Sequence, residues 1–138
     1  MSIDTWDPYQ RDCPSRRLLD RIGDRWTVLI VGALDNGPRR FTEIATEVDG
    51  ISQKMLTQTL RSLERDGFVA RTAYPVVPPH VEYELTELGH SLQHPLRALE
   101  QWAVENMDGV VRRQGAYDRR VPAECAAPGI TLRDTADH

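Results

Sequence analysis

Residues 52–67 carry a start signal, an amphipathic repeat and a stop signal for a single helix. Ser52 can accept a hydrogen bond from an amide of the first turn, and Gly67 can take the left-handed conformation that ends a helix. Leucines recur at helical spacing on one side, and we expect these three to be buried: Leu56, Leu60 and Leu63. The segment therefore predicts a helix with one apolar face and one polar face.

The polar face of this predicted helix is rich in hydrogen-bond donors. Lysine and arginine suit phosphates and guanine edges, glutamine suits adenine, and threonine suits a methyl group or a phosphate. The side chains expected near base edges are Gln53, Lys54, Thr57 and Gln58. Those better suited to phosphates are Arg40, Ser52, Arg61 and Arg65. The alternative is an ordinary amphipathic helix whose polar face is only solvated.

Two β-rich segments, 68–74 and 81–85, follow this helix and predict a hairpin. The loop between them contains Pro75, Pro78 and Pro79, which stiffen it and remove backbone donors. A stiff loop loses little entropy on docking into a groove of DNA, although the prolines can equally serve only to prevent edge pairing. A helix followed by such a hairpin is typical of a winged helix-turn-helix, and we expect Arg71 and His80 to reach phosphate or the minor groove.

The remaining elements are predicted to support the helix within residues 52–67 and the hairpin that follows it. A short helix begins after Cys13, and a second carries a core stripe of Trp26, Leu29, Ile30, Ala33 and Leu34. A brief strand is expected at 40–41, followed by a helix with Thr42 as its cap. The predicted fold class is mainly α with a small β-hairpin (α+β): a winged helix-turn-helix with N- and C-terminal dimerisation helices.

Several blocks of the sequence resemble the HxlR family of bacterial and archaeal transcription regulators, which is related in fold to the MarR group. They are Cys13-Pro14, 22–30, Arg40-Phe41, 50–57, 60–67, 77–86 and Gly89, in unbroken order. The family more often has a second glycine and a lysine where this chain has Asp24 and Arg25. The resemblance implies a dimeric winged-helix DNA binder, with the helix after Ser52 in the major groove.

The predicted domain organisation follows from this resemblance. Residues 1–12 form an N-terminal arm, 13–107 the winged helix-turn-helix domain, and 108–138 a loosely ordered tail. Within the domain, residues 86–107 form a dimerisation helix whose interface residues are Leu88, Leu92, Leu96, Leu99, Trp102 and Ala103. The alternative is that the leucines between 88 and 99 only pack on their own domain.

Composition is compatible with a cytoplasmic regulator. The chain has 138 residues, no visible signal peptide, two cysteines, and an apolar run at 28–34 too short to span a bilayer. The net charge is −4, but residues 37–80 carry six Lys and Arg against five Asp and Glu. This small positive surplus predicts modest non-specific affinity for DNA and greater reliance on individual contacts.

Cys13 is the candidate for a redox or electrophile switch. A sulfur at a helix N-terminus, near Arg16 and Arg17, favours the thiolate, whereas Asp12 opposes it. Some members of the HxlR family use a cysteine at this position as a sensor. The alternative is a small capping or packing residue, and Cys125 in the predicted tail is not expected to regulate.

Other chemistry is weakly indicated. His90 and His94 lie four residues apart with Glu87 nearby, but solvated histidines are the favoured interpretation, so no metal and no cofactor are expected. No nucleophile motif is present, and we expect no enzyme. The sequence predicts a homodimeric repressor on a pseudo-palindromic double-stranded DNA operator, with an oxidant or small molecule as effector and no membrane partner. Alternatives are a small-molecule-responsive regulator without a cysteine switch and a winged-helix protein-interaction module.

Overall fold

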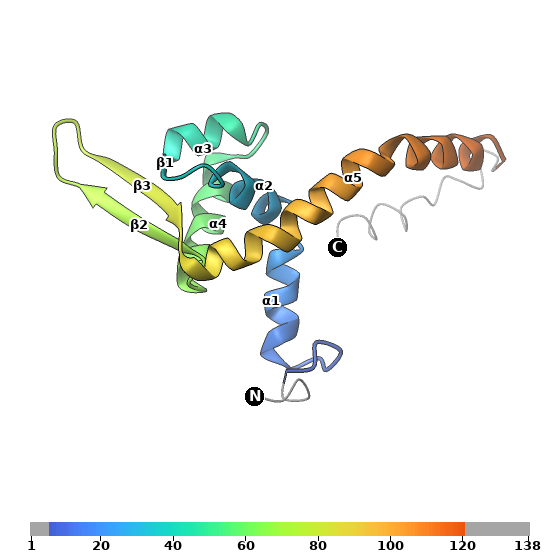
Figure 1. The fold of residues 1–138 in the computed structure, drawn as a ribbon, viewed down its shortest axis with the longest axis horizontal. Helices are drawn as coiled ribbons and strands as arrows, with labels where there is room; N and C mark the ends of the chain where they lie inside the picture. The colour runs from blue at the N-terminus through green and yellow to red at the C-terminus, as the bar shows by residue number, and fades with distance from the viewer. Residues whose placement is uncertain (1–5, 121–138) are drawn as a thin grey trace. The chain divides into compact units, whose positions relative to one another are not determined.

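The computed structural model describes residues 6–120 of the chain (Figure 1). In chain order its elements are α1 Pro14–Ile22, α2 Arg25–Ala33, β1 Arg39–Arg40, α3 Phe41–Glu47, α4 Gln53–Arg65, β2 Val69–Tyr74, β3 His80–Leu85 and α5 Glu87–Arg120. The chain divides into two compact units, residues 1–100 and 101–138. The predicted fold class, mainly α with a small sheet, is confirmed. None of the helices within residues 6–120 combines the length and apolar character needed to cross a membrane.

The sheet of the first unit is antiparallel with strand order β1-β3-β2. Strands β2 and β3 form the predicted hairpin, in which Val69 pairs with Leu85 and Tyr74 with His80. The short β1 lies along the other side of β3, where Arg39 pairs with Tyr83. The hairpin extends away from the helices in Figure 1, so its tip is available to a partner.

The core lies beneath α4. All three predicted leucines of α4 are fully or almost fully buried, and they pack with Ile30 and Leu34 of the α2 segment. The prediction for α2 is wrong at Leu29, whose side chain is 44% exposed, whereas Thr27 and Val31 are buried instead. Other elements cover α2 on more than one side, so its buried face is wider than the apolar stripe that helical spacing predicted.

The start of α3 differs from the sequence expectation. Thr42 does not cap this helix, because Arg40 is the N-cap and Phe41 the first helical residue. The carboxylate of Glu43 accepts a hydrogen bond from the Arg40 amide at 2.7 Å. Because β1 pairs with β3 only as far as Arg40, the chain turns into the helix two residues earlier than the sequence suggested.

Helix α5 is longer than expected. Its N-cap is supplied by Thr86, whose Oγ1 accepts a hydrogen bond from Gly89 N at 3.1 Å. The helix then continues to Arg120, so the prediction of a loosely ordered tail is wrong for residues 108–120. No proline interrupts residues 96–120, and most residues there favour helix. The rest of the predicted tail, including Cys125, lies outside the described residues.

The expected dimer residues of α5 fall into two groups. Leu96 is only 7% exposed and belongs to the core of its own protomer, and Leu92 packs partly against that core. Leu96 is therefore a wrong assignment, since packing against the first unit uses this part of the stripe. Exposed side chains are Leu88, Leu99, Trp102 and Ala103.

Gly89 allows the beginning of α5 to approach the residues that follow α4. A Cβ at this position would lie 2.1 Å from the Phe68 carbonyl oxygen. We expect Gly89→Ala to lower the free energy of unfolding by about 3 kcal/mol, at the upper end of typical overpacking costs. Urea denaturation at fixed protein concentration measures this.

Gly32→Ala is the matched control, because the added Cβ would meet only the Glu100 carboxylate at 3.6 Å. This exchange in α2 should be neutral or stabilise by up to about 1 kcal/mol. Equal effects of the two substitutions would contradict the close approach at Gly89.

Candidate nucleic-acid interface

Helix α4 is fixed at both ends by the residues that the sequence indicated. Ser52 is extended, and its Oγ accepts a hydrogen bond from Met55 N at 3.0 Å. Gly67 has φ of 85° after the C-cap residue Asp66, as the stop signal predicted. The turn that precedes α4 contains Gly50 with φ of 89°, a conformation that other residues rarely adopt. The cap, the turn and the buried leucines together set the direction in which the polar face points.

The polar face of α4 is accessible, as expected. Thr57 is half-buried, and the other predicted contact residues of this segment are exposed: Ser52, Gln53, Lys54, Gln58, Arg61 and Arg65. Donors along the whole length of α4 are thus free of the protein core. Whether each one meets a base or a phosphate stays a prediction.

Arg61 of α4 and Arg71 of β2 line one surface cavity of about 320 Å³. Its other lining residues are Phe41, Thr57, Glu64 and Tyr83. The cavity joins the α4 face to the hairpin, so two guanidinium groups and two hydroxyls border a space suited to a phosphate, with Glu64 offsetting part of the positive charge. Sequence spacing missed Tyr83, which lies opposite Arg71 only because of the β2–β3 register.

Arg40 and His80 have different surroundings. Arg40 is exposed at the junction of β1 and α3. His80 is partly buried, stacks on Tyr74 with ring centroids 4.9 Å apart, and places Nε2 3.3 Å from Glu82 Oε2. These contacts restrain the His80 side chain at the start of β3, so it is less free to reach DNA than the side chain of Arg40. Its role as a DNA contact stays a prediction.

Cys13 lies at the N-cap position of α1, as predicted, and its side chain is partly exposed. Its Sγ is 3.0 Å from Ser15 Oγ. The pKa of the Cys13 thiol is lowered, chiefly by the hydrogen bond with the Ser15 side chain, and a backbone hydrogen bond at Ser15 adds to the effect. The opposing negative charge comes from Asp7 and not, as was expected from the sequence, from Asp12.

The histidines of α5 do not complete a metal site. His90 Nδ1 lies 3.3 Å from Gln93 Oε1. Within residues 6–120 no group of three or more His, Cys, Asp and Glu side chains is arranged to hold a metal ion.

Comparison with known proteins identifies the family. The model of the HxlR-like helix-turn-helix family matches residues 21–110, which include α2 to α4 and the hairpin. The chain belongs to the HxlR-like helix-turn-helix family. The resemblance read from the sequence blocks is therefore confirmed.

Relatives of this HxlR-like chain include an HTH-type transcriptional regulator, YtfH of Escherichia coli K12, which is 47% identical over 103 residues, covering 75% of this chain and 82% of the relative. The solved structure of a transcriptional regulator, ytfH from Salmonella typhimurium, is 43% identical with a TM-score of 0.77, covering 80% of this chain and 98% of that one. The solved structure of the redox regulator HypR in its oxidized form is 40% identical with a TM-score of 0.63, and the match covers 68% of this chain and 97% of that one.

The Ser15 hydroxyl is expected to control the reactivity of Cys13. In a Cys125→Ser background, Ser15→Ala should raise the pKa of the Cys13 thiol, because the thiolate loses a hydrogen-bond donor. Alkylation by iodoacetamide below the new pKa should then slow several-fold, and the rise of the rate with pH should move to higher pH.

Ser91→Ala is the control, since the Ser91 hydroxyl bonds to the Leu88 carbonyl oxygen on α5. It should leave the alkylation profile unchanged. An unaltered profile for Ser15→Ala would show that Ser15 does not govern the thiol.

Proposed function

We propose that this chain is a transcriptional regulator that binds a pseudo-palindromic double-stranded DNA operator as a homodimer and acts as a repressor. The observation that carries the proposal is the position of Arg61 and Arg71. They come from α4 and from the hairpin, and they line the same surface cavity. A recognition helix and a wing can therefore contact one stretch of DNA backbone together, while the first turns of α4 reach into the major groove.

The charge distribution defines how such a protein would find its operator. With only a small positive surplus over residues 37–80, bulk attraction to phosphate is weak. Specificity therefore has to come from hydrogen bonds between base edges and exposed donors near the start of α4, such as Gln53 and Lys54. In a two-fold symmetric dimer the two α4 helices would enter successive major grooves roughly 34 Å apart.

Exposed apolar side chains support a homodimer. Leu18 and Leu19 of α1 are 41% and 54% exposed, and Leu99 and Trp102 of α5 are 54% and 58% exposed. Large apolar groups repeated on the surface of two helices are typical of an interface that is open in an isolated protomer. The proposed interface uses α1 and α5, without Leu96.

The proposed effector is an oxidant or electrophile that acts on Cys13. Its thiol is partly exposed and its pKa is lowered by Ser15, which favours the reactive thiolate. The Cys13 thiolate attacks one oxygen of hydrogen peroxide, so that an S–O bond forms and the O–O bond breaks; the products are a sulfenic acid and hydroxide, which takes up a proton and leaves as water. The likeness to a redox regulator supports this assignment. In this proposal the protein works on chromosomal DNA in the cytoplasm, and its function is binding, without catalysis.

Removal of a donor from α4 should weaken operator binding without unfolding the protein. We expect Lys54→Ala and Arg61→Ala to reduce affinity about tenfold, since each dimer loses two contacts. Arg61→Ala should also reduce the salt slope of binding by about two, if both copies contact phosphate. Mobility-shift titrations on an operator selected from genomic DNA measure both quantities.

Arg113→Ala is the control for these titrations, because Arg113 lies on α5 and bonds to the Gly109 carbonyl oxygen. It should retain full affinity. If both α4 variants bind as tightly as the unmodified protein, α4 is not the recognition helix.

Trp102→Glu should disrupt the proposed dimer, because a charge replaces a large exposed apolar group on α5. Sedimentation equilibrium should show the dissociation constant of the dimer raised at least tenfold. Val77→Glu is the control, since Val77 is 99% exposed at the hairpin tip. A dimer of unchanged stability in Trp102→Glu would remove this residue from the interface.

A further inference from the structure

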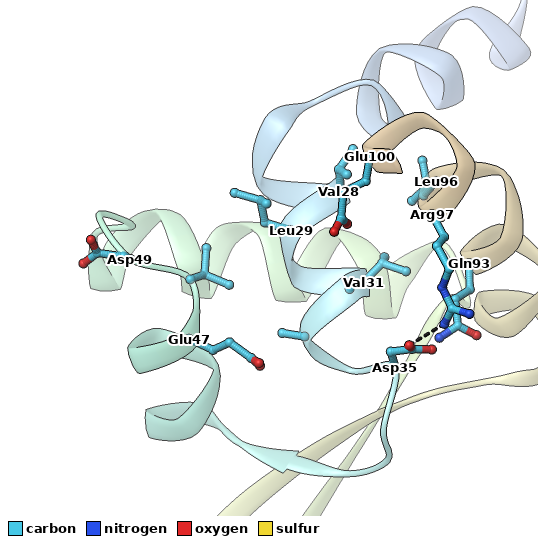
Figure 2. Close-up of a pocket in the computed structure, with 13 residues that line it drawn as sticks. Val28, Leu29, Val31, Asp35, Glu47, Asp49, Gln93, Leu96, Arg97 and Glu100 are labelled. Atoms are coloured by element: carbon cyan, nitrogen blue, oxygen red, sulfur yellow. Dashed lines mark ion pairs between the residues drawn. The ribbon is translucent and has the colours of Figure 1, made fainter. Parts of the chain in front are cut away.

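A cavity of the first unit is lined by α2, the end of α3 and α5 (Figure 2). Its volume is about 490 Å³, which is within the range of small-molecule sites. Residues of α2 lie between Glu47 on one side and Gln93 and Arg97 on the other in Figure 2. All the lining residues belong to residues 28–100, so the cavity is contained within one unit.

The inner wall of the cavity is apolar. The side chains that form it come from α2, from the end of α3 and from α5: Val28, Leu29, Val31, Ala33, Val48 and Leu96. Leu29 is the α2 residue that sequence spacing placed in the core, yet it is 44% exposed and lines this cavity. An occupant with an apolar body would cover this wall and remove it from water.

The polar lining of the cavity is predominantly acidic. Four carboxylates line it, from Asp35, Glu47, Asp49 and Glu100, against the single guanidinium of Arg97. Arg97 forms an ion pair with Asp35, which neutralises that charge. Among the described residues the other three carboxylates have no ion pair. A hollow bordered by one sign of charge concentrates ions of the opposite sign.

A buried amide adds a second, independent feature. The Nε2 atom of Gln93 is inaccessible to solvent and has no hydrogen-bond partner among the described residues. Buried donors without a hydrogen bond are uncommon in folded proteins, because burying such a donor costs free energy. Gln93 also lines the cavity, so a bound molecule with an acceptor atom can satisfy it.

We propose that this cavity binds a small organic cation, namely an amine whose apolar body carries a hydrogen-bond acceptor, through the apolar wall, the Gln93 amide and the carboxylates of Glu47 and Glu100. Neutral apolar molecules would leave the carboxylates without a partner, and anions would be repelled. A bare metal ion would leave the apolar wall exposed. The occupant contacts α5 and also Val48 and Asp49, which lead into the turn before α4.

The test measures ligand binding to the full-length protein without DNA, so it is independent of the proposed operator function. Phenoxybutylammonium, phenoxybutanol and phenoxybutyrate share one apolar body with an ether oxygen as acceptor, and they differ in charge. We expect saturable binding of the ammonium compound at neutral pH and low salt, weaker binding of the alcohol, and none of the carboxylate. Calorimetry gives the affinities, and the NMR signal of the Gln93 side-chain amide reports occupancy of the cavity.

Charge removal completes the test. The double variant Glu47→Gln, Glu100→Gln should weaken phenoxybutylammonium binding about tenfold, as expected for two exposed charges. Glu105→Gln on α5 is the control, because Glu105 does not line the cavity, and it should bind like the unmodified protein. Absence of binding, equal binding of the alcohol, an unaffected double variant, or displacement of the ammonium compound by low concentrations of magnesium would each overturn the proposal.

Discussion

The buried leucine face of α4 is the constraint on which the rest of the structure depends. Leu56, Leu60 and Leu63 are at most 1% exposed and pack with α2, so the opposite face of the same helix must point to solvent. Burying three leucines contributes roughly 5–9 kcal/mol in area-based terms. The polar face therefore occupies its position because the core holds the other face. An exposed side chain of the polar face can therefore be exchanged without removing the packing that holds α4.

Short-range contacts then set the angle at which α4 meets its neighbours. The Ser52 hydroxyl fixes its beginning, and the positive φ of Gly67 turns the chain directly into β2. Arg21 of α1 reaches the C-cap residue Asp66 at 2.6 Å, which connects the N-terminal helix to the end of α4. The C-terminal end of α4 is therefore tied both to β2 and to α1, the helix whose N-cap is Cys13.

Much of this arrangement could be predicted from local signals. Spacing and capping predict the roles of Ser52, Gly67 and the leucines of α4, because both patterns depend on only a few neighbouring residues. Thr42 is not the cap of α3, because a helix start also depends on where strand pairing ends, and the Glu43 carboxylate accepts a hydrogen bond from the Arg40 amide. The predictions for Leu29 and Leu96 are wrong because helical spacing marks an apolar stripe without identifying what covers it. The DNA contacts themselves remain predictions from residue type and exposure.

The sequence by itself determined the family, the order of the elements and the polar face of α4, since these follow from periodicity and from co-linear motifs. Only the tertiary structure decided which side chains from distant elements share a space. It placed Arg71 beside Arg61 through strand register, and it left Glu47 and Glu100 around an apolar hollow through the packing of α3 and α5 on α2. Such sites depend on how elements pack, and packing joins residues whose separation along the chain carries no local signal.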